Sequence, residues 1–427
     1  MLRALANALK LPDLRRKFLI TFLILIFYRL ASHIPVPGID SEGLRKIFES
    51  NQLLGLLNMF SGGAMANFSV AAMGVYPYIT ANIIFQLLQP IIPGLDELAK
   101  EGEAGRNKLN QYMLMLTIPL AALQGFSQAT LLQRGGALTN FGFGRATLLP
   151  TIATLVTLTA GTMFAIWLGE LIDSEGIGNG LSLIIFSGIV AEIPQRVGQL
   201  ILGNPMGLLV FVLITVVTVV AIIFIQEGQR RIPVQYAKRV RGTKIYGGQS
   251  THIPLQVNSA GMIPLIFAVS IMLLPGVVAS YFVGSGIAWV ASVSKAVSDI
   301  FNSEGATYWV LYFVLVLGFT YFYTDVMFQQ QNLAEMLQRQ GGFVPGIRPG
   351  KRTSDYLIGV LRRITLVGAL FLGLIAILPF LTKGIAGTSQ MLVTSTGLLI
   401  VVGVVLDTMK QLEAQLLMRH YEGFIKG

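Results

Sequence analysis

The sequence GLLVFVLITVVTVVAIIFIQ, residues 207–226, decides the fold class of this chain. It is 20 residues long and contains no charged side chain. About 20 consecutive apolar residues form a helix long enough to cross the ~30 Å hydrocarbon core of a bilayer. The strongly basic segment 227–256 follows directly, as expected where the chain re-enters water. The stretch therefore predicts a membrane-spanning helix.

Nine further apolar stretches share this character. They are residues 18–34, 70–92, 112–132, 148–169, 181–202, 257–280, 307–328, 364–382 and 389–407. The whole chain is 53% hydrophobic and only 12% charged, whereas about 25% of the residues of a soluble domain are charged. The sequence therefore predicts an all-α, polytopic membrane protein with ten transmembrane helices.

The basic residues are distributed unequally between the gaps. Of the 31 Lys and Arg residues, 23 lie in alternate gaps, 7 lie in the others, and Arg29 lies inside the first stretch. Basic residues are retained on the cytoplasmic side of membranes, so both termini are expected in the cytoplasm. This pattern also accounts for the net charge of +10. A nucleic-acid target, with ribosomal RNA as its form, stays open as an alternative explanation of that charge.

The ten stretches divide evenly at about residue 205. A half with five spans starts on one side of the membrane and ends on the other, so the second half enters in the opposite direction. We therefore expect two inverted five-helix halves, residues 1–205 and 206–427, with the functional cavity between them. Topology alone predicts this repeat, because the two halves lack clear similarity in their residues.

The beginning of the second apolar stretch is unusual. Its residues are too polar and glycine-rich for lipid and too apolar for a solvated loop: Ser61, Gly62, Gly63, Ala64, Met65, Ala66, Asn67, Phe68 and Ser69. Irregular backbone at membrane depth occurs where protein or a water-filled cavity surrounds it. The alternative is an ordinary external loop with a short surface helix.

Two cytoplasmic segments, 227–256 and 329–363, are long enough to bind partners, since structureless loops beyond about 12–15 residues are uncommon without a function. In the second, Pro345-Gly346 and Pro349-Gly350 favour tight turns on both sides of Arg348. The alternative is that the basic residues only set topology and contact anionic lipid. The candidate docking residues are Arg230, Arg231, Lys238, Arg239, Arg241, Lys244, Arg348, Lys351 and Arg352.

The motifs of common enzyme classes are missing from the sequence. The chain has no Cys and only three separated His residues, so we expect no metal site and no cofactor. It also lacks the phosphate-binding loop of ATPases and a nucleophile elbow. Ionisable residues are scarce at mid-span, which argues against an ion-coupled solute carrier. An inverted-repeat solute transporter and an intramembrane enzyme remain as rivals to a passive channel.

Several motifs, taken in order, resemble the bacterial SecY family, the central subunit of the Sec protein-conducting translocon. They are GVYPYITA at 74–81, GTMF at 161–164, WLGE at 167–170, GIGNG at 176–180, YAKR at 236–239, STH at 250–252 continuing to Asn258, and FVPGIRPG at 343–350. The resemblance covers nearly all of the chain. It implies a channel of the general secretory pathway in the bacterial cytoplasmic membrane, which passes unfolded polypeptides and releases membrane segments laterally into lipid.

The resemblance also implies a ring of aliphatic side chains at the waist of the pore. The ring falls on Ile79, Ile83, Leu181, Ile185, Ile266 and Ile400. Two of its pairs have i, i+4 spacing, which places each pair on one helix face. A narrow apolar ring resists ions by dewetting and offers a moving chain no strong binding point. For any single aliphatic residue, a core or lipid contact is the alternative.

Further roles follow from the resemblance only. The segment 61–69 matches the plug, which as a short, weakly anchored segment could leave the pore. A lateral gate is implied between helices at 75–92 and 257–280, with Asn258 as a polar gate residue. The basic loops would dock the SecA ATPase or the ribosome, with Arg348 as the key arginine. The implied partners are the SecE and SecG subunits, and the implied substrates are preproteins with signal sequences.

Overall fold

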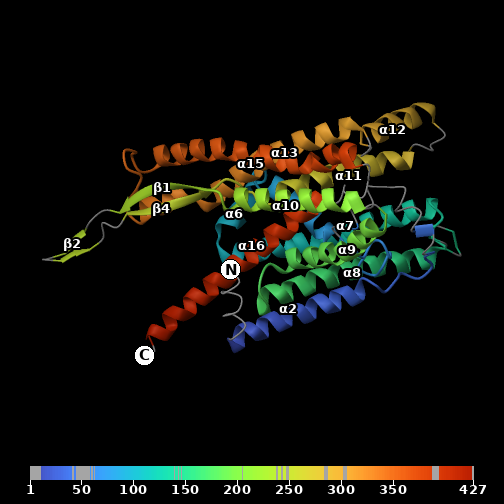
Figure 1. Ribbon diagram of the computed structural model, residues 1–427, viewed down its shortest axis with the longest axis horizontal. Coiled ribbons are helices and arrows are strands. Elements are labelled where there is room, and N and C mark those ends of the chain that lie inside the picture. Colours follow the sequence, from blue (N-terminus) through green and yellow to red (C-terminus); the bar gives the residue numbers. More distant parts are fainter. Residues whose placement is uncertain are drawn as a thin grey trace. The chain divides into compact units, whose positions relative to one another are not determined.

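The computed structural model is dominated by helices (Figure 1). It describes residues 11–40, 43–44, 58, 61, 63–138, 140–142, 144–145, 147–203, 205–236, 239–241, 244–246, 250–282, 287–301, 305–386 and 394–425. Among these, the helices are α2 Pro12–Ala31, α5 Tyr76–Leu88, α6 Pro93–Lys100, α7 Glu103–Arg134, α8 Leu148–Glu175, α9 Gly180–Gly203, α10 Pro205–Glu227, α11 Ile263–Phe282, α12 Ala288–Ile300, α13 Ala306–Gln331, α14 Leu333–Arg339, α15 Lys351–Ala386 and α16 Thr394–Ile425.

Each of the ten apolar stretches overlaps one of these helices, and the helical fold class is confirmed. Within the described residues, four helices are individually long and apolar enough to cross a membrane: Glu103–Gln133, Leu148–Glu175, Ala306–Arg339 and Lys351–Leu381. The bent pair α5 and α6 makes a fifth if it forms one span. The chain is thus a multi-pass membrane protein, while the count of ten spans stays a prediction.

The second apolar stretch differs most from its expected helix. We expected a span over 70–92, but α5 covers only Tyr76–Leu88 and turns precede it. Pro90 and Pro93 account for the early end, because proline restricts the preceding residue and cannot continue the helical hydrogen bonds. The chain then bends by 106° into α6.

The chain contains two compact units. The first comprises residues Met1–Leu208 and Ile400–Gly427, and the second comprises Leu209–Leu399. The first unit thus includes α2, α5 to α9 and most of α16. The inverted relation between the halves 1–205 and 206–427 stays a prediction.

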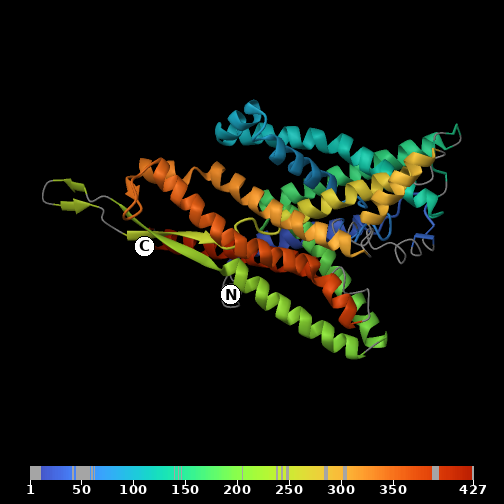
Figure 2. The ribbon, with the colours of Figure 1, turned by 90° about the horizontal axis from the view of Figure 1, so that it is seen from above.

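The segment 227–256 contains strands, which the sequence patterns had not indicated. The strands are β1 Gln229–Tyr236, β2 Arg239–Arg241, β3 Lys244–Tyr246 and β4 Ser250–Gln256, with β5 Gly342–Phe343 from the second large loop. β1 pairs antiparallel with β4, from Gln229 opposite Gln256 to Gln235 opposite Ser250, and pairs with β5 on its other side. Figures 1 and 2 show β2 and β3 beyond the end of the β1–β4 pair.

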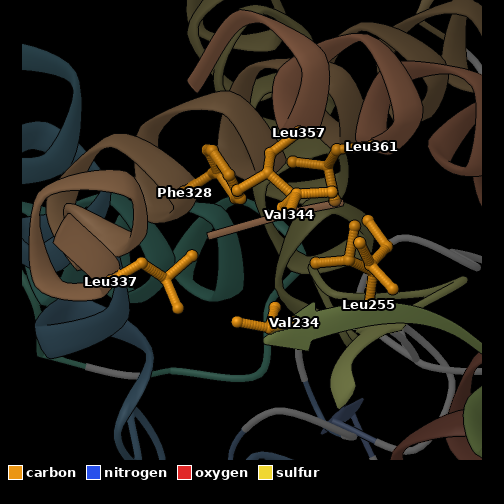
Figure 3. Close-up of a cluster of buried hydrophobic side chains, with 8 residues drawn as sticks. Val234, Leu255, Phe328, Leu337, Val344, Leu357 and Leu361 are labelled. Carbon is orange, nitrogen blue, oxygen red and sulfur yellow. The ribbon is translucent and has the colours of Figure 1, made fainter. Parts of the chain in front are cut away.

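One face of this sheet covers a small hydrophobic core in the second unit. Ile232 and Val234 of β1 are buried while their neighbours in the strand are exposed, which is the two-residue period of a strand with one buried face. The core combines the sheet with α13, α14 and α15 through Ile232, Val234, Leu255, Phe328, Leu337, Val344, Leu357 and Leu361 (Figure 3). The two large loop segments, 227–256 and 329–363, therefore contribute to one core.

Candidate functional site

The segment 61–69 is held by hydrogen bonds from several elements of the first unit. The hydroxyl of Tyr28 in α2 donates to the carbonyl oxygen of Ser61 at 2.7 Å. The Asn58 side chain accepts from the backbone N–H of Ala66 at 2.8 Å through Oδ1, and its Nδ2 donates to the Glu192 carboxylate of α9. These bonds join parts of the chain up to 134 residues apart.

The same segment buries apolar side chains. Met65 and Phe68 have no exposed surface, whereas Ala66 and Asn67 are exposed. The backbone N–H of Val36 donates to the carbonyl of Phe68, and the backbone N–H of Val70 donates to the carbonyl of Ile34. These two hydrogen bonds join the segment to the chain that follows α2. Gly62 lies outside the described residues. The segment is therefore held more firmly than the weakly anchored segment that its glycines suggested.

Gly63 has a backbone conformation that favours glycine. Its φ is +83°, in the left-handed region, and a Cβ there would lie 3.0 Å from Nη1 of Arg29. The carboxylate oxygen of Glu192 is also near, at 3.6 Å from the same point. The segment thus runs beside an arginine and a glutamate, and its left-handed backbone conformation at Gly63 favours glycine.

None of the six predicted ring residues is exposed. Ile83, Ile185, Ile266 and Ile400 are buried, and Ile79 and Leu181 are half-buried. Five of them belong to the first unit and Ile266 to the second. The observed burial disfavours a lipid contact for these residues, and their grouping into one ring stays a prediction.

The junction between α8 and α9 positions Leu181. A Cβ on Gly169 would lie 2.8 Å from Cδ2 of Leu181, and a Cβ on Gly180 would lie 2.0 Å from the carbonyl oxygen of Gly169. Only residues without side chains allow two helix backbones to approach so closely. The Asp173 carboxylate accepts the backbone N–H of Gly180 at 2.7 Å, which caps the first turn of α9.

The turn before α9 is also tied to two other helices. The backbone N–H of Ile177 donates to Oγ1 of Thr21 in α2 at 3.1 Å. The N–H of Gly178 donates to Oε1 of Gln411 in α16 at 3.1 Å. Ile177 is buried with Leu14 and Leu412 in a core shared by α2 and α16. The GIGNG motif therefore joins three separate helices, through contacts that no sequence pattern indicates.

In the segment 329–363, Arg348 lies in the loop between two turns, as the Pro-Gly pairs predict. The N–H of Ile347 donates to the carbonyl of Val344 at 3.0 Å, and Gly346 has φ +82°, as a turn with Pro at its second position and Gly at its third requires. Val344 is buried in the sheet core and Ile347 packs against it. Arg348 itself is exposed, and its carbonyl accepts the Thr353 hydroxyl at 2.9 Å.

The structure describes the side chains of some of the other predicted docking residues and only the backbone of others. Arg230, Arg231, Lys351 and Arg352 have exposed side chains at the sheet and at the start of α15. The backbones of Arg239, Arg241 and Lys244 lie in the β2–β3 hairpin. Lys238 lies outside the described residues. These four basic side chains are therefore accessible to a partner, and their use in docking stays a prediction.

Asn258, the predicted gate residue, lies in the turn before α11 and is buried. Its Nδ2 donates to the carbonyl of Gly261 at 3.1 Å.

An ion pair that no sequence pattern indicates joins α13 to α15, where the guanidinium of Arg362 lies 2.9 Å from the carboxylate of Asp325. Within the described part of the chain, three or more His, Cys, Asp or Glu side chains nowhere gather into a group that could hold a metal ion.

Comparison with known proteins identifies the family. The family model SecY matches residues 69–409. Proteins described as protein translocase subunit SecY are 46% identical in Halalkalibacterium halodurans and 44% identical in Mycobacterium tuberculosis, with both chains covered completely. The corresponding protein of Thermotoga maritima is 41% identical and covers 100% of this chain and 98% of its own.

Solved structures share the fold. A structure described as a protein conducting channel aligns with a TM-score of 0.64 at 16% identity, over 94% of this chain and 92% of the other. A structure of Sec61 in a canine ribosome-channel complex aligns with a TM-score of 0.60 at 15% identity, over 94% and 92%. The ordered motifs, the helical architecture and the full-length similarity lead to one conclusion: this chain belongs to the SecY family.

Proposed function

We propose that this chain is the channel subunit of a protein translocase. It passes unfolded polypeptides across the membrane and releases apolar segments laterally into lipid. The observation that carries the proposal is the full-length similarity, at 41–46% identity, to proteins described as protein translocase subunit SecY. The similarity to a structure described as a protein conducting channel supports the same fold.

The ring residues Ile79, Ile83, Leu181, Ile185, Ile266 and Ile400 form the waist of the channel in this proposal. The low solvent exposure of these side chains supports an inward position. An apolar waist excludes ions when empty. It also suits a substrate that presents every side-chain type, because the wall offers no fixed polar partner that would bind one of them tightly.

The segment 61–69 is the plug of the resting channel. A solved structure that this chain resembles is described as showing that the plug domain of SecY stabilises the closed state and maintains a membrane seal. The hydrogen bonds of Tyr28 and Asn58 supply the interactions that would hold such a seal in place. Opening must break them, so they contribute to the energetic threshold for opening.

In this proposal the basic residues of the cytoplasmic loops bind the partner that drives translocation. The channel carries no ATP-binding motif, so the SecA ATPase or the ribosome supplies the energy, with Arg348 as the central contact. A related structure is a ribosome-channel complex. The SecE and SecG subunits complete the assembly. Asn258 contributes to the lateral gate. The chain resides in the bacterial cytoplasmic membrane, with both termini in the cytoplasm. No catalytic step is assigned to it.

Crosslinking to an arrested substrate tests the proposal directly. The chain contains no cysteine, so single cysteines at Ile79, Ile185 and Ile400 can form disulfides with a cysteine in a stalled preprotein. We expect disulfides at all three positions. The control is a cysteine at Ile118, which is 48% exposed on α7 and should not react. Equal crosslinking at all four positions, or crosslinking only at Ile118, would exclude the proposed path.

A further inference from the structure

The helix α12, Ala288–Ile300, connects α11 to α13 and is not one of the ten apolar stretches. Figure 1 shows it at the end of α13 opposite the sheet of the same unit. It packs against α11. Ser294 of α12 is buried, and a Cβ on Gly276 of α11 would lie 3.4 Å from Cβ of Phe301, the residue that follows α12.

The opposite side of α12 presents an apolar stripe. Trp289, Val293, Ala296 and Ile300 follow the i, i+4, i+7, i+11 spacing, so they share one helix face. All four are exposed, with Trp289 at 70%, Val293 at 54% and Ile300 at 43%. A helix of a water-soluble surface would carry polar residues at these positions, so the stripe requires an apolar partner.

A polar strip runs beside the apolar stripe. Ser292, Lys295 and Asp299 are exposed and follow the i, i+3, i+7 spacing. α12 therefore has a packed side, an apolar side and a polar side. Its 13 residues give a length of about 20 Å, too short to cross the ~30 Å apolar core of a bilayer. This combination is typical of a helix that lies in the membrane–water interface.

We propose that α12 lies flat in the lipid interface on the external side, with the Trp289–Ile300 stripe inserted among lipid chains. The helices before and after α12 in the chain also carry exposed apolar side chains, Val278 and Phe282 of α11 and Val310 of α13. Tryptophan is enriched at this depth, because its ring is apolar while its indole N–H can reach polar headgroups. The helix fixes the depth at which the outer ends of α11 and α13 sit.

The charges of α12 specify the kind of lipid contact. The polar strip carries one Lys and one Asp, so it has no excess charge for anionic headgroups. The contact is apolar, and vesicles of phosphatidylcholine alone should support it as well as vesicles that contain phosphatidylglycerol. This inference concerns how the chain sits in the membrane and not what it transports. It would therefore hold even if the chain did not conduct polypeptides.

Tryptophan fluorescence provides the first test. The chain has three tryptophans, Trp167, Trp289 and Trp309, so replacing Trp167 and Trp309 by Phe leaves a single reporter on α12. In purified protein in vesicles, lipids brominated near the headgroup end of the chain should quench Trp289 more than lipids brominated near the terminal methyl. Aqueous iodide should quench it weakly. The variant that keeps only Trp167, which is exposed on α8, is the positive control for lipid contact.

Thiol labelling provides the matched control. Val293→Cys on the apolar stripe and Lys295→Cys on the polar strip are both at exposed positions, and residues two apart in a helix point about 160° apart around its axis. With a water-soluble maleimide on both sides of the vesicle, Val293→Cys should react on the order of tenfold more slowly, because the reactive thiolate does not form in an apolar environment. Both should react equally in denaturing detergent. Equal rates in vesicles, or strong iodide quenching of Trp289 without bromolipid quenching, would overturn the proposal and indicate water or an absent protein partner.

Discussion

The backbone of Gly180 at the start of α9 lies directly against the carbonyl of Gly169 in α8. A Cβ built on Gly180 would lie 2.0 Å from that oxygen, which is far inside any permitted contact. Leu181 follows in the chain and rests on the same glycine. The two glycines therefore set the distance between two helices and the position of a predicted ring residue.

Substituting alanine for Gly180 should destabilise the protein. The clash involves backbone, which cannot rotate away, so α9 must shift from α8 at a cost of about 1–3 kcal/mol. Thermal unfolding in detergent measures the effect. Gly198→Ala in the same helix is the control, because nothing lies within 4 Å of its Cβ position. Equal melting temperatures for the two variants would show that the contact is not rigid.

Replacing Ile83, Ile185 and Ile400 together by Ser should make the resting channel leak. A polar waist stays hydrated, so ion conductance in planar bilayers should rise on the order of tenfold or more. The matched variant replaces Ile118, Ile152 and Ile223 by Ser, all of which are exposed on their helices. Unchanged conductance in the first variant, with the protein folded, would remove these residues from the waist.

Removing the Asn58 side chain should weaken the segment 61–69. Asn58→Ala loses the bonds to Ala66 and Glu192, each worth about 1 kcal/mol, so the closed state should leak more ions while the helices stay folded. Asn67→Ala is the control, since Asn67 is exposed in the same segment. A leak of the same size in both variants would mean that the observed bonds do not hold the plug.

Reversing the charge at Arg348 should stop export driven by the ATPase without unfolding the protein. The side chain is exposed and its loop is held by Val344 and the turn at Gly346, so Arg348→Glu changes the surface and not the core. Translocation into inverted membrane vesicles measures export. Arg339→Glu changes the charge equally at an exposed position of α14 and should export normally. Normal export by the Arg348→Glu variant would show that Arg348 is not needed for docking the ATPase.

Much of the architecture could be predicted from the chain alone. The ten apolar stretches each overlap a helix, because segments without charges must satisfy their backbone hydrogen bonds internally in lipid. The turn before Arg348 was also predictable, since Pro-Gly restricts φ locally. These features depend on residues that are close in sequence.

The details of the site depend on residues far apart in the chain. The strands β1 and β4 form because residues on both sides of a long loop pair with each other. The helix α5 is shorter than the apolar stretch because prolines interrupt it, although the stretch stays apolar throughout. Asn58 with Glu192, and Ile177 with Thr21, meet across 134 and 156 positions. Single residues carry no local signal of such partners.

The membrane class, the expected orientation, the family resemblance and the turn beside Arg348 can all be predicted from the residues alone. These follow from transfer free energies and local backbone restrictions, which act on each segment separately. Three features became visible in the folded chain: the hydrogen bonds that hold the segment 61–69, the close approach of α8 and α9 at Gly169 and Gly180, and the exposed apolar face of α12. Those features arise from packing between distant segments, where side-chain size and hydrogen-bond geometry select one arrangement.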